Sequence, residues 1–125
     1  MTNYRNWNQR IFNVLFDIAK SVEPIRSARL AAAIVHKNQI ISIGTNKLKT
    51  DPLQARHNKR HNQIFIHAEV DAIKNARYRI DLSKCDLYVV RAKQQNKIWV
   101  TGFSKPCVGC QEIIEYYQLR NVFYT

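Results

Sequence analysis

The sequence contains little of what membrane-spanning, secreted or flexible proteins use. No run of about 18 apolar residues occurs, so we expect no membrane-spanning helix and no membrane partner. Residues 1–8 are polar and predict no secretory signal peptide. Only three cysteines occur, and two of them are three positions apart, which favours reduced thiols on a metal over a disulfide framework. We therefore expect a cytoplasmic protein.

Acidic residues are also scarce. Nine Asp and Glu oppose twenty Lys and Arg, which gives a formal net charge of +11. This excess predicts attraction to phosphate-bearing partners, such as a nucleotide or single-stranded nucleic acid, and an acidic membrane would also satisfy it. A basic surface that only keeps the protein in solution is the alternative interpretation.

Repeats, Gly/Ser-rich linkers and low-complexity tracts are absent, so we predict a single domain over residues 1–125. The periodicity of apolar residues and the turn residues between them predict, in chain order, a helix over 7–22, a hairpin of strands 30–35 and 39–44, a helix over 67–76, a strand over 87–90, a helix over 106–118 and a last strand over 121–125. Strand–helix–strand units with buried apolar strands imply parallel pairing. The predicted fold class is α/β, with a helix-covered mixed sheet that starts with a helix and a β-hairpin and ends at the fourth strand.

Two short motifs, His67–Glu69 and Pro106–Cys110, each open a predicted helix. Cysteines at i and i+3 can bind one tetrahedral zinc ion, and a helix N-terminus favours their thiolate form. His67 would supply a third ligand from the other helix. Two thiolates from Cys107 and Cys110 and one neutral imidazole leave a fourth position open, which is the arrangement of catalytic zinc.

Glu69 would then lie near a water molecule that zinc activates. Residues two apart do not share a face of a regular helix, so His67 and Glu69 reach one site only if the helix points its first turn at it. The sequence therefore predicts two helices directed end-on at one metal. Cys-x-x-Cys alone is also found in structural zinc half-sites and redox pairs, but its combination with His-x-Glu at two helix starts favours catalysis.

These residues resemble the cytidine deaminase-like superfamily of zinc-dependent deaminases, whose signature is His-x-Glu followed by Pro-Cys-x-x-Cys. The resemblance extends over nearly the whole chain. It implies one catalytic zinc ion per chain and hydrolytic deamination of a nucleobase, with Glu69 moving protons. It also implies that Asn46 binds substrate and that the backbone of Ala68 contacts the edge of the base.

Within this superfamily, residues 67–73 are most similar to the deoxycytidylate (dCMP) deaminase type, and small phage-encoded members are similar in size. That branch usually has Asn at the position of Asp71. We predict a cytosine nucleotide such as dCMP as substrate, converted to the uracil form with release of ammonia. The alternatives are a deaminase of cytosine or adenine in single-stranded DNA or RNA, and a non-catalytic zinc-stabilised binding module.

The basic segment 47–62 connects Asn46 to His67 and must pass the mouth of the pocket. We predict that Arg56, Lys59 and Arg60 bind phosphate there, on a nucleotide or on a strand. A solvated basic face is the alternative.

Three smaller features complete the sequence predictions. Phe103, in the loop before the second motif, is expected to line the pocket and stack on a base. His57 and His61 have the i, i+4 spacing of a metal-binding pair, although core or surface roles are more frequent. Family members usually add a strand after the one matched by residues 121–125, so we expect an unpaired edge there and a homo-oligomer that buries it.

Overall fold

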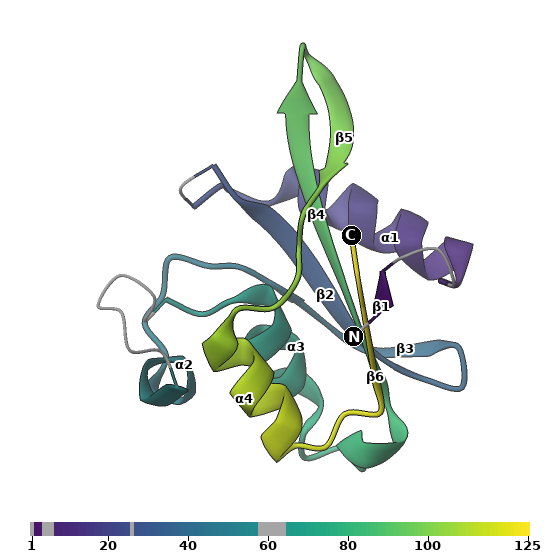
Figure 1. Ribbon diagram of the computed structural model, residues 1–125, viewed down its shortest axis with the longest axis vertical. Coiled ribbons are helices and arrows are strands. Elements are labelled where there is room, and N and C mark those ends of the chain that lie inside the picture. The colour runs from purple at the N-terminus through teal and green to yellow at the C-terminus, as the bar shows by residue number, and fades with distance from the viewer. Residues whose placement is uncertain (1, 4–6, 26, 58–64) are drawn as a thin grey trace.

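The computed structural model describes residues 2–3, 7–25, 27–57 and 65–125. The elements in chain order are β1 (Thr2–Asn3), α1 (Gln9–Ser21), β2 (Arg29–His36), β3 (Gln39–Thr45), α2 (Pro52–His57), α3 (Ala68–Ala76), the 3-10 turn η3 (Leu82–Lys84), β4 (Asp86–Gln95), β5 (Ile98–Gly102), α4 (Val108–Tyr116) and β6 (Asn121–Tyr124) (Figure 1).

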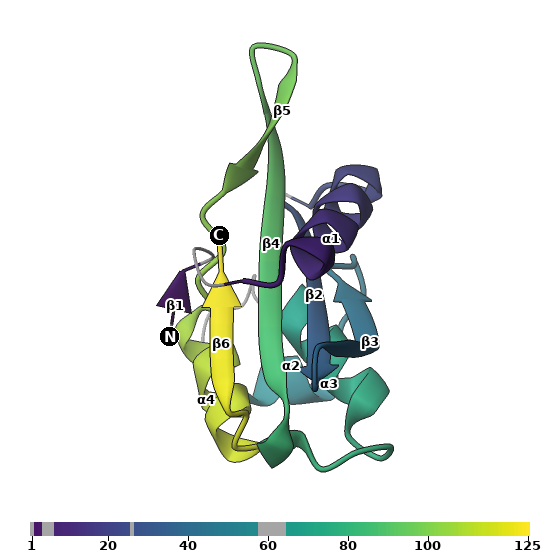
Figure 2. The same cartoon turned by 90° about the vertical axis from the view of Figure 1, so that its right-hand side faces the viewer.

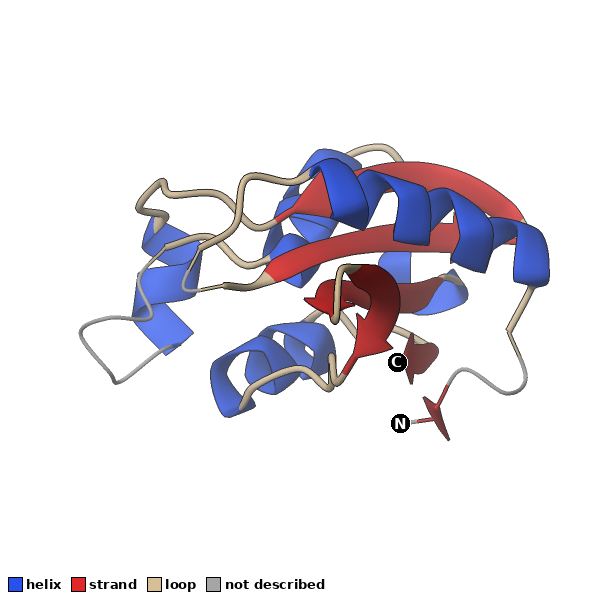
Figure 3. Cartoon of the chain, turned by 90° about the horizontal axis from the view of Figure 1, so that it is seen from above, coloured by secondary structure: helices blue, strands red, loops and turns tan. Residues whose placement is uncertain are grey.

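The strands form one mixed sheet in the order β1-β6-β4-β2-β3, with β5 paired to β4 beside this path. β2 is antiparallel to β3 and β4, whereas β6 is parallel to β4. Helix α1 covers one face of the sheet, and α3 and α4 cover the other (Figures 2 and 3). The predicted α/β fold with a helix-covered mixed sheet is confirmed.

Strand β2 is buried on both faces because its side chains alternate between two apolar layers. Ala32 and Ile34 pack in the core under α3 and α4, while Ala31, Ala33 and Val35 pack in the core under α1. Residues 30–35 are therefore apolar at every position, because both faces of the strand are buried. Its antiparallel partner β3 follows a two-residue turn at Lys37 and Asn38, which both have positive φ, as such hairpin turns require.

Helix α1 forms as its spacing predicts. Asn8 caps it by accepting hydrogen bonds from the backbone nitrogens of Arg10 and Ile11. Ile11, Leu15 and Ala19, spaced four apart, are fully buried against the sheet. None of the helices described in the structure is long and apolar enough to cross a membrane.

The sheet has two strands that the sequence did not predict. Residues 98–102, expected to lie in a loop, form β5 and pair antiparallel with residues 91–95 of β4. The turn between them, at Asn96 and Lys97, again has positive φ at both residues. The resulting hairpin projects beyond the rest of the described chain (Figure 1).

Strand β1 is the second addition, and it lies parallel to β6, with Thr2 opposite Phe123 and Asn3 opposite Tyr124. The expectation of a fully unpaired edge at the last strand is therefore wrong at these two positions. A homo-oligomer stays a prediction that no contact described here tests.

Gly44 allows β3 and α3 to approach closely. A Cβ atom at this position would lie 2.2 Å from the backbone nitrogen of Ala72 and 2.4 Å from the backbone oxygen of Ala68. Beside it, the hydroxyl of Ser42 donates a hydrogen bond to the Ala72 carbonyl at 2.7 Å. This contact fixes the start of α3 against the sheet.

Gly44→Ala should lower the free energy of unfolding by about 3 kcal/mol, because the three nearest atoms that the new methyl group meets all belong to the backbone and cannot rotate away. Urea unfolding followed by circular dichroism measures the loss. Ser42→Ala, which removes one hydrogen bond at the same interface, should cost only about 1 kcal/mol. Equal stability of the Gly44→Ala variant and the parent would contradict the proposed close approach.

Candidate active site

The starts of α3 and α4 meet at one point. His67 is the N-cap of α3 and Cys107 is the N-cap of α4, and neither side chain caps its own helix. His67 Nδ1 lies 3.2 Å from Cys110 Sγ and 3.7 Å from Cys107 Sγ. Among the described residues these three form the only group with metal-ligand spacing, as predicted.

The spacing of these atoms fits zinc. Tetrahedral zinc, with bonds of about 2.0 Å to nitrogen and 2.3 Å to sulfur, would separate a ligand nitrogen from a ligand sulfur by about 3.5 Å. The two observed nitrogen–sulfur distances, 3.2 Å and 3.7 Å, bracket this value. One imidazole and two thiols are also the donors that zinc prefers.

The two thiols differ in acidity. The hydrogen bond with Cys110, aided by His67 and opposed by burial, lowers the pKa of Cys107 to about 3. The same hydrogen bond, together with burial and the nearby charge of Glu69, raises the pKa of Cys110 well above its usual value. A metal dication supplies the positive charge that a second buried thiolate needs, so these residues suit metal binding.

Glu69 lies in the first turn of α3 with its side chain almost fully buried beside the ligands. Burial raises the pKa of this carboxyl, and the charge of His67 acts in the opposite direction. A carboxyl that lies close to the metal ligands and can change its protonation state is suited to proton transfer. The structure thus has the end-on geometry that the His67 and Glu69 spacing required.

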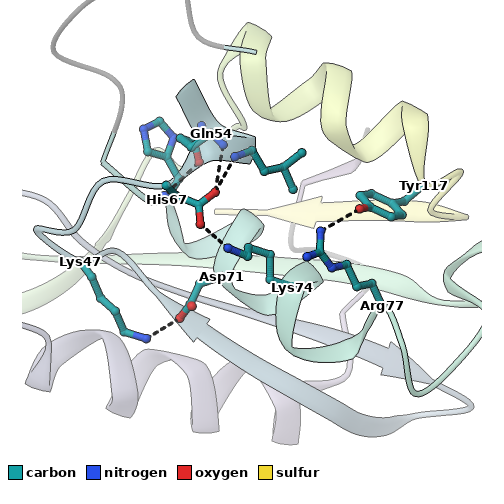
Figure 4. Close-up of polar contacts among 9 residues, drawn as sticks. Lys47, Gln54, His67, Asp71, Lys74, Arg77 and Tyr117 are labelled. Carbon is teal, nitrogen blue, oxygen red and sulfur yellow. Dashed lines mark hydrogen bonds and ion pairs between the residues drawn. The ribbon is translucent and has the colours of Figure 1, made fainter. Parts of the chain in front are cut away.

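Sequence reasoning missed Gln54, a fully buried residue of α2. Its side-chain oxygen accepts a hydrogen bond from the backbone nitrogen of His67 at 3.1 Å, and its side-chain nitrogen donates to Cys110 Sγ at 3.6 Å. Gln54 therefore contacts both ligand-bearing segments, and its contact with the His67 segment is drawn in Figure 4. No local pattern in the polar segment 47–62 distinguishes it.

Asp51 holds α2, and with it Gln54, against α3. Its carboxylate accepts hydrogen bonds from the backbone nitrogens of Leu53 and Gln54, and it forms an ion pair with Lys74 of α3. Burial by itself raises the pKa of Asp51, but the hydrogen bonds from Lys74 and Gln54 outweigh it, and the net pKa is lowered.

Asp71, where the dCMP deaminase type usually has Asn, has a role within the chain. Its carboxylate accepts a hydrogen bond from the backbone nitrogen of Thr45 at 3.1 Å and pairs with Lys47 Nζ at 2.8 Å (Figure 4). It therefore ties α3 to the end of β3.

An open cavity of about 320 Å³ is lined by two of the three ligands, His67 and Cys107. It is lined by Ile25, Ala28, Leu30, Asn46, Phe65, Ile66, His67, Ala68, Glu69, Arg91, Phe103, Ser104, Lys105 and Cys107. The structure thus brings Asn46, Ala68 and Phe103 to the cavity, as predicted. Arg91, Ser104 and Lys105 were not foreseen.

Asn46 already makes two hydrogen bonds at the cavity wall. Its side-chain oxygen accepts from the backbone nitrogen of Leu30 at 2.8 Å, and its side-chain nitrogen donates to the Ala28 carbonyl at 3.0 Å. Asn46 therefore holds the segment that leads into β2, and one amide hydrogen remains for a ligand.

Arg56 does not line this cavity. It lies in a separate hollow between α2, α3 and α4, because the last turn of α2 packs against α4. In its neighbour His57, the ring atom Nδ1 lies 3.1 Å from Oε2 of Glu112 in α4. Lys59 and Arg60, for which phosphate contacts were predicted, lie outside the described residues, and so does His61 of the possible metal-binding pair.

The family model of the cytidine and deoxycytidylate deaminase zinc-binding region matches residues 5–125. The chain belongs to this family. Its His67, Cys107 and Cys110 fit the one zinc ion that the name of this family's zinc-binding region implies. No curated protein sequence matches this chain significantly.

Solved structures share the fold of this deaminase at low sequence identity. Guanine deaminase from Bacillus subtilis has a TM-score of 0.63 and 23% identity, over 94% of this chain and 63% of that one. The dCMP deaminase of cyanophage S-TIM5 has a TM-score of 0.61 and 17% identity, over 94% and 83%. A tRNA:A34 deaminase has a TM-score of 0.58 and 18% identity, over 93% and 74%. The present chain spans less than two thirds of the guanine deaminase chain, and the names of these proteins give different molecules as substrates.

Gln54→Leu should weaken zinc binding about 10- to 100-fold, because outer hydrogen bonds orient metal ligands. Competition with a colorimetric chelator measures the affinity, and far-ultraviolet circular dichroism checks the fold. Gln111→Leu serves as the matched control, since the Gln111 side chain bonds only to the Pro106 carbonyl among the described residues. An unchanged zinc affinity in the Gln54 variant would show that Gln54 does not support the ligands.

Asp51 should make stability depend on pH. Because its folded-state pKa lies below the unfolded value of 3.8, its contribution is present above that value and is lost as pH falls through the folded pKa. The parent should therefore exceed Asp51→Asn in unfolding free energy by about 1–2 kcal/mol at pH 6, and the gap should narrow below about pH 4. Urea unfolding at both pH values measures it. A gap independent of pH would contradict the charge-based role.

Proposed function

We propose that this zinc deaminase acts on cytosine in a nucleotide such as dCMP and produces the uracil form with release of ammonia. The observation that carries the proposal is the placement of Glu69 beside the three ligands at one end of an open cavity. The similarity of residues 67–73 to the dCMP deaminase type and the shared fold with the cyanophage dCMP deaminase support the choice of base.

Zinc bound by His67, Cys107 and Cys110 supplies a Lewis acid that brings the pKa of a water molecule close to neutral. The Glu69 carboxylate would accept a proton from the water molecule whose oxygen adds to the ring carbon that bears the amino group. Glu69 then gives that proton to the adjacent ring nitrogen. It transfers the second water proton to the amino group, which leaves as ammonia. The buried position of Glu69 keeps bulk water from competing for these protons.

Three residues on the cavity wall would hold the base. The backbone of Ala68 faces the base edge, and the remaining amide hydrogen of Asn46 reaches the ligand. Phe103 is 64% exposed at the cavity and contacts the Tyr124 ring edge-on, with 5.9 Å between ring centroids. An exposed ring held at one edge can stack on a base with its face.

A polynucleotide deaminase is the second candidate. The net charge of +11 favours it, because basic surfaces attract the phosphates of single-stranded DNA or RNA. Ammonia release from dCMP, deoxycytidine and oligonucleotides that carry cytosine or adenine separates the two candidates. Turnover of an oligonucleotide without turnover of dCMP would replace the first proposal by the second.

Glu69→Gln should bind one zinc ion per chain and lose at least about 1,000-fold in the rate of ammonia release from dCMP, because the amide cannot carry protons. Zinc content by atomic absorption and a coupled ammonia assay measure both. Glu115→Gln, the same change at an exposed position of α4, should leave zinc content and rate unaltered. A near-normal rate in the Glu69 variant would exclude it as the proton carrier.

A further inference from the structure

Arg91 occupies an unusual position on the inner face of β4. Side chains on a strand alternate, so Leu87, Val89 and Arg91 point to the same side of the sheet. Leu87 and Val89 are fully buried against α3 and α4. The next residue in this row is a cation, and it lines the cavity beside the ligands.

The Arg91 side chain has no partner among the described residues. Its Nε atom is buried without a hydrogen bond, and its guanidinium forms no ion pair. Its backbone nitrogen donates a hydrogen bond to Thr125 Oγ1 at 3.2 Å, which leaves the side chain unengaged. A buried donor without an acceptor is costly, which indicates that something else supplies the acceptor.

Gly102 makes room for the Arg91 side chain. It is the residue opposite Arg91 in the β4–β5 pairing, and a Cβ there would lie 2.9 Å from Arg91 Cδ and 3.1 Å from Cγ. The stem of Arg91 therefore lies along the backbone of β5, which leads directly into residues 103–107 at the cavity (Figure 1).

Charge in the cavity lining is uneven. Lys105 also lines the cavity and forms no ion pair with any described residue, while Glu69 is the only acidic residue of the lining. The Glu69 carboxyl lies with the ligands and is not paired with Arg91. The wall formed by Arg91 and Lys105 is thus a cationic surface that lacks an anion.

We propose that Arg91, together with Lys105, forms an anion subsite of the cavity that binds the phosphate of a nucleoside phosphate. This rests on the proposed function and adds which residues bind the phosphate of its substrate, so a free base or nucleoside binds less well. Guanidinium donors match phosphate oxygens in pairs, and Lys105 adds a second charge. This subsite takes the place of the contact predicted for Arg56, which lies in a separate hollow.

Steady-state kinetics of the zinc-loaded chain with dCMP and deoxycytidine test the subsite. Arg91→Gln should raise KM for dCMP about 30-fold and leave kcat/KM for deoxycytidine within about two-fold, because only dCMP loses a charge-assisted contact. The KM of Arg91→Lys for dCMP should lie between those of the parent and Arg91→Gln. Lys93→Gln, two positions further along the same strand and exposed, is the matched control and should behave as the parent.

Direct binding separates this proposal from the proposed function. Calorimetric titration of Glu69→Gln, with and without Arg91→Gln, should show that dCMP binds more tightly than deoxycytidine only when Arg91 is present. Such binding without any turnover of dCMP by the parent would retain the subsite and reject the proposed function. Normal dCMP deamination with an unchanged KM in Arg91→Gln would reject the subsite alone.

A cytosine-bearing oligonucleotide identifies the source of the phosphate. The subsite would be assigned to a phosphodiester if the parent turned over the oligonucleotide, Arg91→Gln did not, and neither the parent nor Arg91→Gln turned over dCMP. Equal losses for dCMP and deoxycytidine would overturn the proposal, because Arg91 would then act on the fold or on the base. Thermal melting of each variant checks that the fold is intact.

Discussion

The meeting of two helix starts is the constraint on which the rest of the structure depends. His67 begins α3 and Cys107 begins α4, and both side chains turn to a common point instead of capping their helices. Helix N-termini carry partial positive charge, which stabilises the thiolate that a metal needs. The sheet makes this possible, because β3 packs closely on α3 at Gly44, and β6 returns parallel to β4 after α4.

Polar residues keep these starts in place without covering the cavity. Gln54 satisfies one backbone donor and one sulfur with a single buried amide, and Asp51 secures the helix that carries it. Asp71 fastens the other side of α3 to the end of β3. A buried polar network of this kind specifies one arrangement, since each unmet partner would be costly.

The zinc ligands could be predicted from the sequence because their signal is local. A fixed spacing at a helix start determines where His67 and Cys107 point, whatever the remaining chain does. The strand β5 could not be predicted, because the last three of the residues it pairs with, 93–95 of β4, are polar and exposed and show no apolar alternation. The roles of Gln54 and Arg91 could not be predicted for a related reason. Their roles depend on residues distant in the chain, and a sequence pattern reports only near neighbours.

Strand β4 is ten residues long, and two different strands share one of its sides. Strand β6 pairs with its first half and β5 with its second, and Ser104 closes the junction by donating a hydrogen bond to the Val89 carbonyl at 2.9 Å. The first half of β4 thus lies in the core under α3 and α4, and its second half carries the projecting hairpin. Substitutions in the hairpin can therefore change the cavity wall at Arg91 while the metal ligands His67, Cys107 and Cys110 stay untouched.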